Sequence, residues 1–278
     1  MENISQFGKG AIRDKYDPRD YQIKKLDTFG ASVIPDEFSF RDSFDQTPIK
    51  NQDGSLSCGG QAFSKYFEGL SFNRDGVAII LSAKDIYQPV CVPGWGSKAR
   101  DLIQRVLSEG IALESDISSY ENGKAPSEQF METSQPRTPE QDDRAHEHQG
   151  LKYFTFDSTD PEQVKEAIWQ GKGCILALEG NNPCWTTQDG IVEIPETTTW
   201  GHFLVLTGRK KINRSYYWEA CNSWGLVGDN GYYYIPEEYL NKGLGYNEWT
   251  FIEAPAQEYS MLQQIIILLS KIIGLIKK

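Results

Sequence analysis

The sequence has 278 residues, of which 39% are hydrophobic and 12% aromatic, a composition typical of globular proteins. Its formal net charge of −11 argues against a protein that binds nucleic acid through a basic surface. The N-terminus lacks a basic segment followed by an apolar run, so we expect no secretory signal and a cytoplasmic location. Five dispersed cysteines do not form the pattern of a disulfide scaffold, and we expect free thiols.

Residues 1–37 are polar and are interrupted by Pro18 and Pro35, so we interpret them as an N-terminal arm ahead of a main domain at 38–253. The first helix of that domain is predicted just after Gly60, where apolar residues recur at helical spacing. Its buried face consists of Ala62, Phe63, Tyr66, Phe67 and Leu70.

Two more helices are predicted from their end signals. The second lies within residues 97–110, with Ser97 as its N-cap and Gly110 at its end. The third begins after the N-cap Asp160, has a proline at its first position and ends at Gly171. Between them, residues 121–150 are almost all polar and indicate a surface excursion.

The third helix is followed by short apolar runs that glycine and polar turns separate, a pattern typical of strands. These runs occupy residues 174–180, 201–210, 215–225 and 231–236. Helices therefore dominate early and strands late, and this order favours the α+β fold class.

The C-terminal residues 254–278 are interpreted as a linker followed by an amphipathic helix. The stretch "MLQQIIILLSKIIGLIKK" at 261–278 places polar pairs seven residues apart among apolar residues. Its length is borderline for spanning a bilayer, and the polar stripe argues against lipid on all sides. Three interpretations stay open: self-association, contact with a membrane surface by a protein that is otherwise cytoplasmic, and docking against the same chain.

Cys58, in "NQDGSLSCGGQAFS", lies just before the first predicted helix. A helix N-terminus lowers the pKa of a thiol, so this position suits a cysteine nucleophile. Such a nucleophile needs a base, and His202 opens an apolar strand that could hold it rigidly. His146 and His148 lie in the polar excursion, and their spacing alone does not indicate a metal site.

Asn222 follows the next apolar run and comes two residues before Trp224. An asparagine side-chain oxygen can accept the imidazole N–H of a histidine and so fix its orientation. A neighbouring tryptophan would shield that hydrogen bond from water. Together with Cys58 and His202, these residues predict a Cys-His-Asn catalytic group.

This combination resembles the papain-like cysteine peptidase family, and the N-terminal "YDPRDY" resembles a segment of its bacterial and phage-type members. His202 lies 144 residues after Cys58, within the family's interval of about 130–150 residues. The matching stretches are "PDEFSFRD", "IKNQDGSLSC", "LSAKDIY", "SEGIALES", "GHFLVLTG" and "NSWGLVGDNGYYYIPEEYL". The resemblance implies a two-lobed catalytic domain at 38–253, in which a helical lobe and an antiparallel β-rich lobe flank the active-site cleft.

The resemblance also implies roles for single residues. Cys58 and His202 would form a thiolate–imidazolium pair, with Asn222 orienting the imidazole and Trp224 covering that contact. Gln52 lies six residues before Cys58, at the family's offset, and would donate its side-chain amide to the oxyanion. The glycine-rich "VPGWGS" is either a plain turn or the loop that pairs with a substrate backbone, which implies substrate contacts at Gly94, Trp95 and Gly96.

We therefore expect a thiol protease, a hydrolase that cleaves protein or peptide substrates through a thioester acyl-enzyme without a metal or cofactor. Two alternatives stay open: a non-catalytic papain-fold protein that binds or assembles a partner, and a cysteine amidase that acts on peptidoglycan. A second alignment puts Gly60 at the nucleophile position and implies an inert protein. The short arm could occupy the cleft, although no residue in it indicates that it does.

Overall fold

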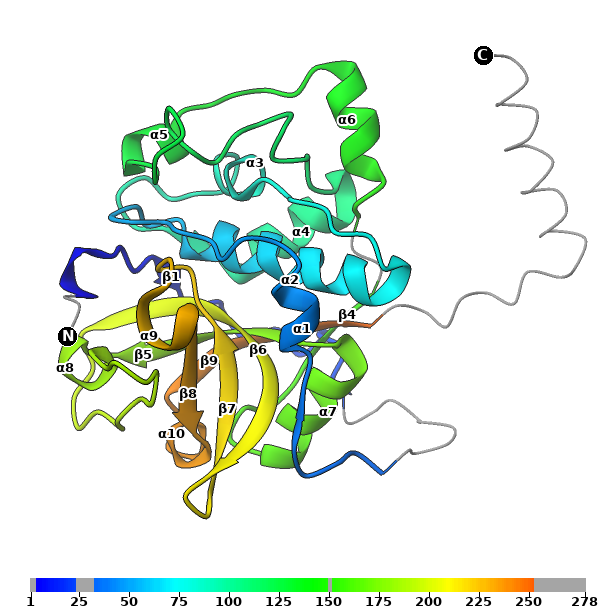
Figure 1. Cartoon of the computed structure of the whole chain (residues 1–278). Helices are drawn as coiled ribbons and strands as arrows, with labels where there is room; N and C mark the ends of the chain where they lie inside the picture. Colours follow the sequence, from blue (N-terminus) through cyan, green and yellow to red (C-terminus); the bar gives the residue numbers. More distant parts are fainter. Residues whose placement is uncertain (1–3, 24–32, 150–151, 253–278) are drawn as a thin grey trace, which may run out of the picture.

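A computed structural model describes residues 4–23, 33–149 and 152–252 (Figure 1). Its elements form two lobes, one of helices and one built on a large antiparallel sheet. The helical lobe is at the top of Figure 1 and the sheet at the bottom, with the helix α2 between them. This architecture confirms the two-lobed α+β fold that the sequence predicts.

The elements of both lobes are as follows. The helices are η1 (Ile4–Gln6), α1 (Arg41–Phe44), α2 (Cys58–Asp75), α3 (Ala83–Tyr87), α4 (Ala99–Glu109), α5 (Glu128–Glu132), α6 (Pro139–His146), α7 (Pro161–Gly171), α8 (Asn182–Trp185), α9 (Val227–Asn230) and α10 (Glu237–Asn241). The strands are β1 (Ala11–Ile12), β2 (Phe38–Ser39), β3 (Ser97–Lys98), β4 (Lys152–Thr155), β5 (Cys174–Gly180), β6 (Trp200–Ile212), β7 (Ser215–Cys221), β8 (Tyr232–Pro236) and β9 (Gly245–Ile252).

The large sheet has the strand order β4-β9-β5-β6-β7-β8, and β2 pairs with β6 beside this path. Its pairings are all antiparallel. β6 and β7 are neighbours, with Val205 opposite Cys221. His202 near the start of β6 and Asn222 just after β7 therefore lie at the same end of two adjacent strands.

The helix α2 forms the contact between the lobes. Its residues from Cys58 to Ser71 are all buried, including the charged Lys65 and Glu68. The five apolar residues predicted for its buried face share one hydrophobic cluster with side chains of the sheet. The helix is buried on all sides over this length because the sheet packs on one side and α3 and α4 on the other.

Three predicted helix boundaries hold and one is wrong. Asp160 caps α7 by accepting the backbone N–H of Glu162, α7 ends at Gly171, and α4 ends directly before Gly110, as expected. Ser97 is not the N-cap of α4, because it lies in β3 and its N–H is bound to the Gly10 carbonyl. The N-terminus of α4 is instead capped by the arm, because the Asp14 carboxylate accepts the backbone N–H of Arg100 at 3.1 Å.

The four predicted strands correspond to β5, β6, β7 and β8. Strands β4 and β9 were not predicted from the sequence, although β9 pairs with both β4 and β5 inside the sheet. The polar excursion at 121–150 carries α5 and α6 and is attached to the helical lobe. Its Met131 is buried, and the Arg137 guanidinium binds the buried carboxylate of Asp85.

The predicted C-terminal helix at 261–278 lies outside the described residues, as does the linker before it. Among the described helices, none has the length and apolar character needed to cross a membrane.

Candidate active site

Cys58 is the first residue of α2 and is fully buried. Its sulfur accepts the backbone N–H of Gly10 at 3.3 Å, and the N–H groups of Phe203 and Gly59 also point at it. Phe203 directly follows His202 on β6. The sulfur therefore lies where the N-terminus of α2 meets the start of β6, which brings together the two chain segments that the sequence predicts to share a site.

The thiol of Cys58 is held in its neutral form. Burial raises its pKa to about 11, and the three N–H groups around the sulfur lower it by less. The sequence predicts a lowered pKa from the helix N-terminus. That prediction is wrong for the described form, because the loss of solvent around the sulfur outweighs the favourable backbone donors.

His202 is fully buried, and its Nε2 lies 2.7 Å from Oδ1 of Asn222. The Trp224 ring covers this pair, with its centroid 4.6 Å from that of the imidazole. Burial lowers the pKa of His202 to about 3, against an opposing contribution from Asn222 and together with the nearby positive charge of Lys9. Within the described residues, Nδ1 of His202 has no hydrogen-bond partner.

The side-chain amide of Gln52 is fixed at both ends. Its Nε2 donates to the carbonyl oxygens of Gly8 at 2.9 Å and Ser55 at 2.8 Å, while its Oε1 accepts the hydroxyl of Ser223 at 2.6 Å. The Ser223 backbone N–H donates to Oδ1 of Asn222. Ser223 therefore links the orienter of the histidine to the proposed oxyanion donor. This residue was not predicted from the sequence, although it lies within the matching stretch that begins "NSWG".

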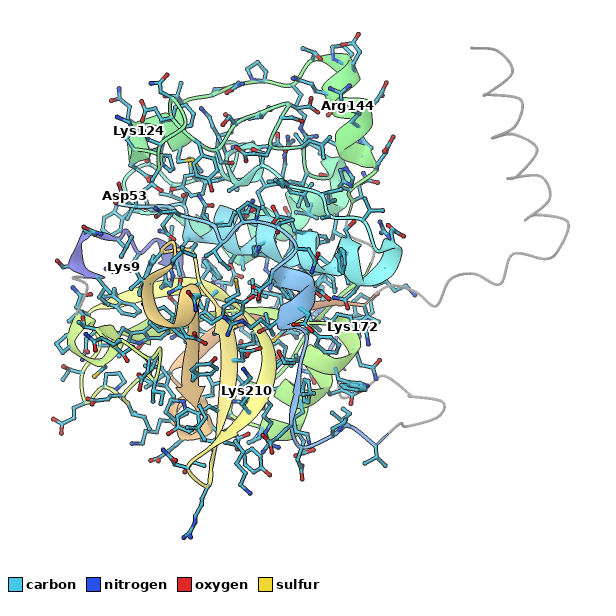
Figure 2. The ribbon with its side chains drawn as sticks, viewed as in Figure 1. Lys9, Asp53, Lys124, Arg144, Lys172 and Lys210 are labelled. Carbon is cyan, nitrogen blue, oxygen red and sulfur yellow. The ribbon has the colours of Figure 1, made fainter. Side chains whose placement is uncertain are left out.

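The N-terminal arm covers these residues. The N–H of Gly8 donates to the Asp53 carbonyl at 2.8 Å, and Gly10 contacts the Cys58 sulfur as described above. Lys9, between these two glycines, lies 5.3 Å from the Trp224 ring centroid. Figure 2 shows Lys9 and Asp53 near each other at one edge of the molecule.

Both glycines of the arm permit close backbone approach. A Cβ atom at Gly8 would overlap the carbonyl oxygen of Ser55, and one at Gly10 would overlap that of Leu56. Any larger residue at either position would push the arm away from the loop that precedes Cys58.

The arm continues along both lobes on either side of these glycines. Before them, Phe7 stacks on Trp224 with ring centroids 5.6 Å apart. After them, β1 pairs with β3 in parallel, with Ala11 opposite Ser97. The sheet lobe holds the same stretch, because the Tyr246 hydroxyl donates to the Ala11 carbonyl at 3.1 Å.

The glycine-rich segment forms a tight hairpin, in which Val92 and Gly96 form an isolated bridge. Gly94 lies at its turn, and the side chain of Trp95 is largely exposed. Gly96 leads into Ser97, whose N–H binds the Gly10 carbonyl at 2.9 Å. The segment thus pairs with an extended backbone, although in the described form that backbone is the arm.

The geometry at Gly60 tests the alternative alignment, which puts this glycine at the nucleophile position. A Cβ atom on Gly60 would lie 2.6 Å from the Ala83 carbonyl oxygen and 2.8 Å from Cβ of Tyr87. This position therefore faces α3 and leaves no room for a nucleophile. Cys58 lies beside the arm and β6.

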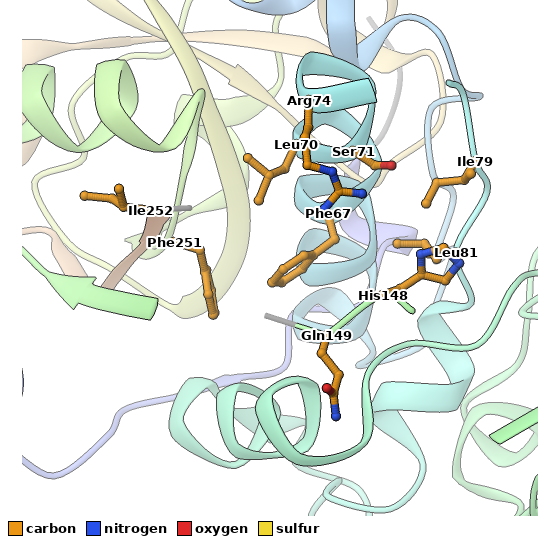
Figure 3. A pocket seen from close by; sticks show the side chains of 10 residues that line it. All are labelled: Phe67, Leu70, Ser71, Arg74, Ile79, Leu81, His148, Gln149, Phe251 and Ile252. Carbon is orange, nitrogen blue, oxygen red and sulfur yellow. The ribbon is translucent and has the colours of Figure 1, made fainter. Parts of the chain in front are cut away.

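The other two histidines lie away from this site. His146 is the exposed last residue of α6. His148 is half-buried and lines a pocket with Phe67, Leu81 and Phe251, on the C-terminal half of α2 (Figure 3). In the described ranges, no three His, Cys, Asp or Glu side chains are grouped as a metal site would need. All five cysteines are free thiols.

These features define a cysteine peptidase of the papain type, and comparison with known proteins agrees. The model of the papain family cysteine proteases matches residues 34–247, more than three quarters of the chain. The chain belongs to this family and is a cysteine-type peptidase.

Individual relatives are distant in sequence. Zingipain-1 from Zingiber officinale is 24% identical over 206 residues, which cover 72% of this chain and 86% of that protein. Xylellain, a cysteine protease from Xylella fastidiosa, superposes with a TM-score of 0.72 at 20% identity, covering 91% of this chain and 99% of its own. Procathepsin L2 from the larval midgut of Tenebrio molitor has a TM-score of 0.72 at 18% identity, covering 90% and 80%.

Proposed function

We propose that the protein hydrolyses peptide bonds with Cys58 as nucleophile, His202 as base and Asn222 as the residue that orients the base. The main support is that the Cys58 sulfur touches the N–H of Phe203, next to His202, while Nε2 of His202 is taken by Asn222. This contact leaves Nδ1 as the imidazole nitrogen that can exchange a proton with the thiol.

In the proposed reaction, proton transfer from Cys58 to Nδ1 of His202 gives a thiolate, which attacks the carbonyl carbon of the substrate. The carbonyl electron pair moves to oxygen, where Nε2 of Gln52 and the backbone N–H of Cys58 stabilise it. His202 then protonates the leaving amine as the C–N bond breaks, which gives a thioester. Water, deprotonated by His202, attacks the thioester and releases the carboxylic acid and the thiol.

We also propose that the described form is latent. Cys58, His202 and Gln52 are completely buried, and the Gly8 carbonyl already uses the Gln52 amide that the substrate oxyanion would need. Burial further keeps both members of the catalytic pair uncharged, with a raised pKa at Cys58 and a lowered one at His202. The arm must therefore move away before a peptide can bind.

The experiment compares the full chain with a Gly8→Ala/Gly10→Ala variant, in which both new methyl groups overlap the loop before Cys58. The variant should hydrolyse fluorescently labelled casein faster than the full chain. Adding Cys58→Ala or His202→Ala should lower that activity by a factor of at least about 10³. Exposure of the Cys58 thiol without any hydrolysis would contradict the peptidase proposal and favour an amidase or a binding protein.

We further propose a member of the bacterial and phage type, in which residues 4–14 of the arm inhibit the enzyme. The N-terminal "YDPRDY" supports the type, and the contacts of Gly8 with Gln52 and of Gly10 with Cys58 support the inhibition. A synthetic peptide of residues 4–14 should inhibit the Gly8→Ala/Gly10→Ala variant, whereas the same peptide with both alanines should not.

A further inference from the structure

The short helix α5 carries two glutamates one turn apart, and each is bound to a different loop of the cleft. Glu128 accepts the backbone N–H of Leu56 at 2.5 Å and the hydroxyl of Tyr87 at 2.7 Å. Glu132 accepts the backbone N–H of Gly94 at 2.7 Å. Residues four apart project from the same face of a helix, so one surface of α5 reaches both loops.

The first loop carries the catalytic donors. Leu56 lies between Gln52 and Cys58, and its carbonyl faces Gly10 of the arm. The second loop is the hairpin at 92–96, which leads to the backbone that pairs with the arm. A peptide bound in the cleft must therefore lie along these two loops of the helical lobe, and α5 contacts both loops.

The helix α5 is itself fixed in place. Its Met131 is buried in a small cluster with Ala83 and Tyr87 of α3, and Nζ of Lys84 lies 3.6 Å from the Phe130 ring centroid. Ser127 caps the helix by accepting the N–H of Phe130. The two glutamate side chains therefore extend from a support that is anchored on α3.

The two carboxyl groups also contact each other. Burial raises the pKa of Glu128, and the neighbouring Glu132 carboxyl raises it further. Tyr87 opposes this by donating to the ionised form. The two side chains thus lie side by side while each holds its own loop.

We propose that Glu128 and Glu132 are positioning residues of the peptidase: Glu128 fixes the loop of the oxyanion donors, and Glu132 fixes the hairpin that pairs with the substrate. This inference rests on the proposed function. It assigns the polar excursion at 121–150 a direct part in shaping the cleft, although none of its residues is a reacting group.

The test measures kcat and KM for a peptide substrate in the full chain with Gly8→Ala/Gly10→Ala. Glu132→Ala should raise KM about tenfold with kcat within about twofold, because the pairing hairpin is loosened. Glu128→Ala should lower kcat about tenfold with KM within about twofold, because the oxyanion loop is loosened. Glu128→Gln and Glu132→Gln keep an acceptor oxygen and should restore most of each loss.

Asp143→Asn is the matched control, since Asp143 is an exposed acid of α6 in the same excursion. It should leave both constants unchanged. Equal changes of kcat and KM in the two alanine variants, or effects no larger than those of Asp143→Asn, would overturn the proposal.

A second readout does not need activity. Hydrogen exchange should become faster at the Gly94 amide in Glu132→Ala and at the Leu56 amide in Glu128→Ala, each without the other, and should stay close to that of the parent chain in the glutamine variants. If peptide hydrolysis is absent from all forms, the peptidase proposal fails while the exchange pattern still decides the positioning. Unchanged exchange at both amides in the alanine variants overturns it. If the alanine variants do not fold, Glu128→Leu and Glu132→Leu, which also lack an acceptor oxygen, take their place.

Discussion

The carbonyl oxygen of Gly8 lies 2.9 Å from Nε2 of Gln52, the nitrogen that the proposed mechanism assigns to the substrate oxyanion. Two residues later, the N–H of Gly10 is bound to the sulfur of Cys58. A single tripeptide of the arm thus occupies both the oxyanion donor and the nucleophile. Inhibition and catalysis use the same atoms, so weakening the arm contacts should increase activity without any change to catalytic residues.

The Gly10→Ala substitution alone should release the arm. Its methyl group would overlap the Leu56 carbonyl, and overpacking of this kind costs about 1–3 kcal/mol. We expect the fraction of open cleft to rise about tenfold or more, since 1.4 kcal/mol is a factor of ten. The rate at which iodoacetamide modifies Cys58, read by mass spectrometry of the peptide, measures this fraction.

Gly54→Ala is the control for Gly10→Ala. Gly54 belongs to the same loop as Ser55, but a Cβ atom there would lie 3.5 Å from its nearest neighbour, the Gln6 carbonyl oxygen. In the Gly54→Ala variant, Cys58 should be alkylated at the same rate as in the unchanged chain. If Gly10→Ala reacts no faster than Gly54→Ala, the arm does not limit access to Cys58.

Ser223→Ala should reduce turnover through Gln52. The Ser223 hydroxyl fixes Oε1 of Gln52, and its loss leaves a buried acceptor unpaired while the contact of the Ser223 N–H to Asn222 remains. We expect kcat in the arm-released chain to fall about tenfold, compared with about 10²–10³ for Gln52→Ala.

Ser108→Ala serves as the comparison, because the hydroxyl of this exposed serine donates to carbonyls of its own helix, α4. It should have the kcat of the parent chain. A Ser223→Ala variant with unchanged kcat would show that Gln52 is oriented without the Ser223 hydroxyl.

Docking of the arm should weaken as pH rises from 4 to 6, because Asp14 loses a proton on release. Under the arm both members of the catalytic pair are neutral, and on release His202 takes the proton that Cys58 gives up, so the pair leaves the number of bound protons unchanged. Asp14 has a pKa of about 6 in the docked arm against a usual 3.8, chiefly because of burial, so its protonation favours docking. Release should therefore increase by about tenfold for each pH unit over this range.

Asp14→Asn removes this effect and retains an acceptor for the Arg100 N–H. Release of the arm should then depend little on pH between 4 and 6. Hydrogen exchange of the amides in residues 4–14, corrected for the intrinsic pH dependence of exchange, reports docking directly. The account of Asp14 is wrong if the variant and the unchanged chain show the same slope.

The buried carboxylate of Glu68 should be important for stability. It lies 2.5 Å from Nζ of Lys50 and 3.7 Å from Nζ of Lys65, and it accepts the Leu81 N–H. Glu68→Gln leaves two buried ammonium groups without a counter-charge. We expect the free energy of unfolding to fall by about 3–5 kcal/mol in chemical denaturation.

The surface pair of Glu238 and Lys242 provides the contrast, since both side chains are more than half exposed. Glu238→Gln should change the free energy of unfolding by less than about 1 kcal/mol. Similar losses for both substitutions would mean that the Glu68 cluster is solvated more than its burial indicates.

Local sequence patterns predicted the parts of the fold in which local signals and tertiary packing agree. The helix α7 has an N-cap, a proline and a regular apolar face, and the structure places it as expected. Strand β9 was not identified, because "GYNEWTFI" contains polar residues and a register shift interrupts its pairing with β5. The capping of α4 by Asp14 joins residues far apart in the chain and has no local signal.

The candidate site divides in the same way. Cys58, His202 and Asn222 were predicted from residue type, spacing and resemblance, and the structure brings their segments together. Ser223, Glu128 and Glu132 were missed because their role depends on which backbone or amide group they reach in space. The two glycines of "GKG" are the one signal in the arm that could have indicated close contact with the cleft.

The most direct test of the central claim is the pH dependence of Cys58 alkylation in the Gly8→Ala/Gly10→Ala chain. If His202 takes the proton of Cys58, the thiol should react preferentially among the five cysteines, with an apparent pKa below about 7. His202→Ala should return this pKa to the ordinary thiol range of about 8.5. Equal labelling of all five cysteines, or a Cys58 profile that His202→Ala leaves unchanged, would contradict the account.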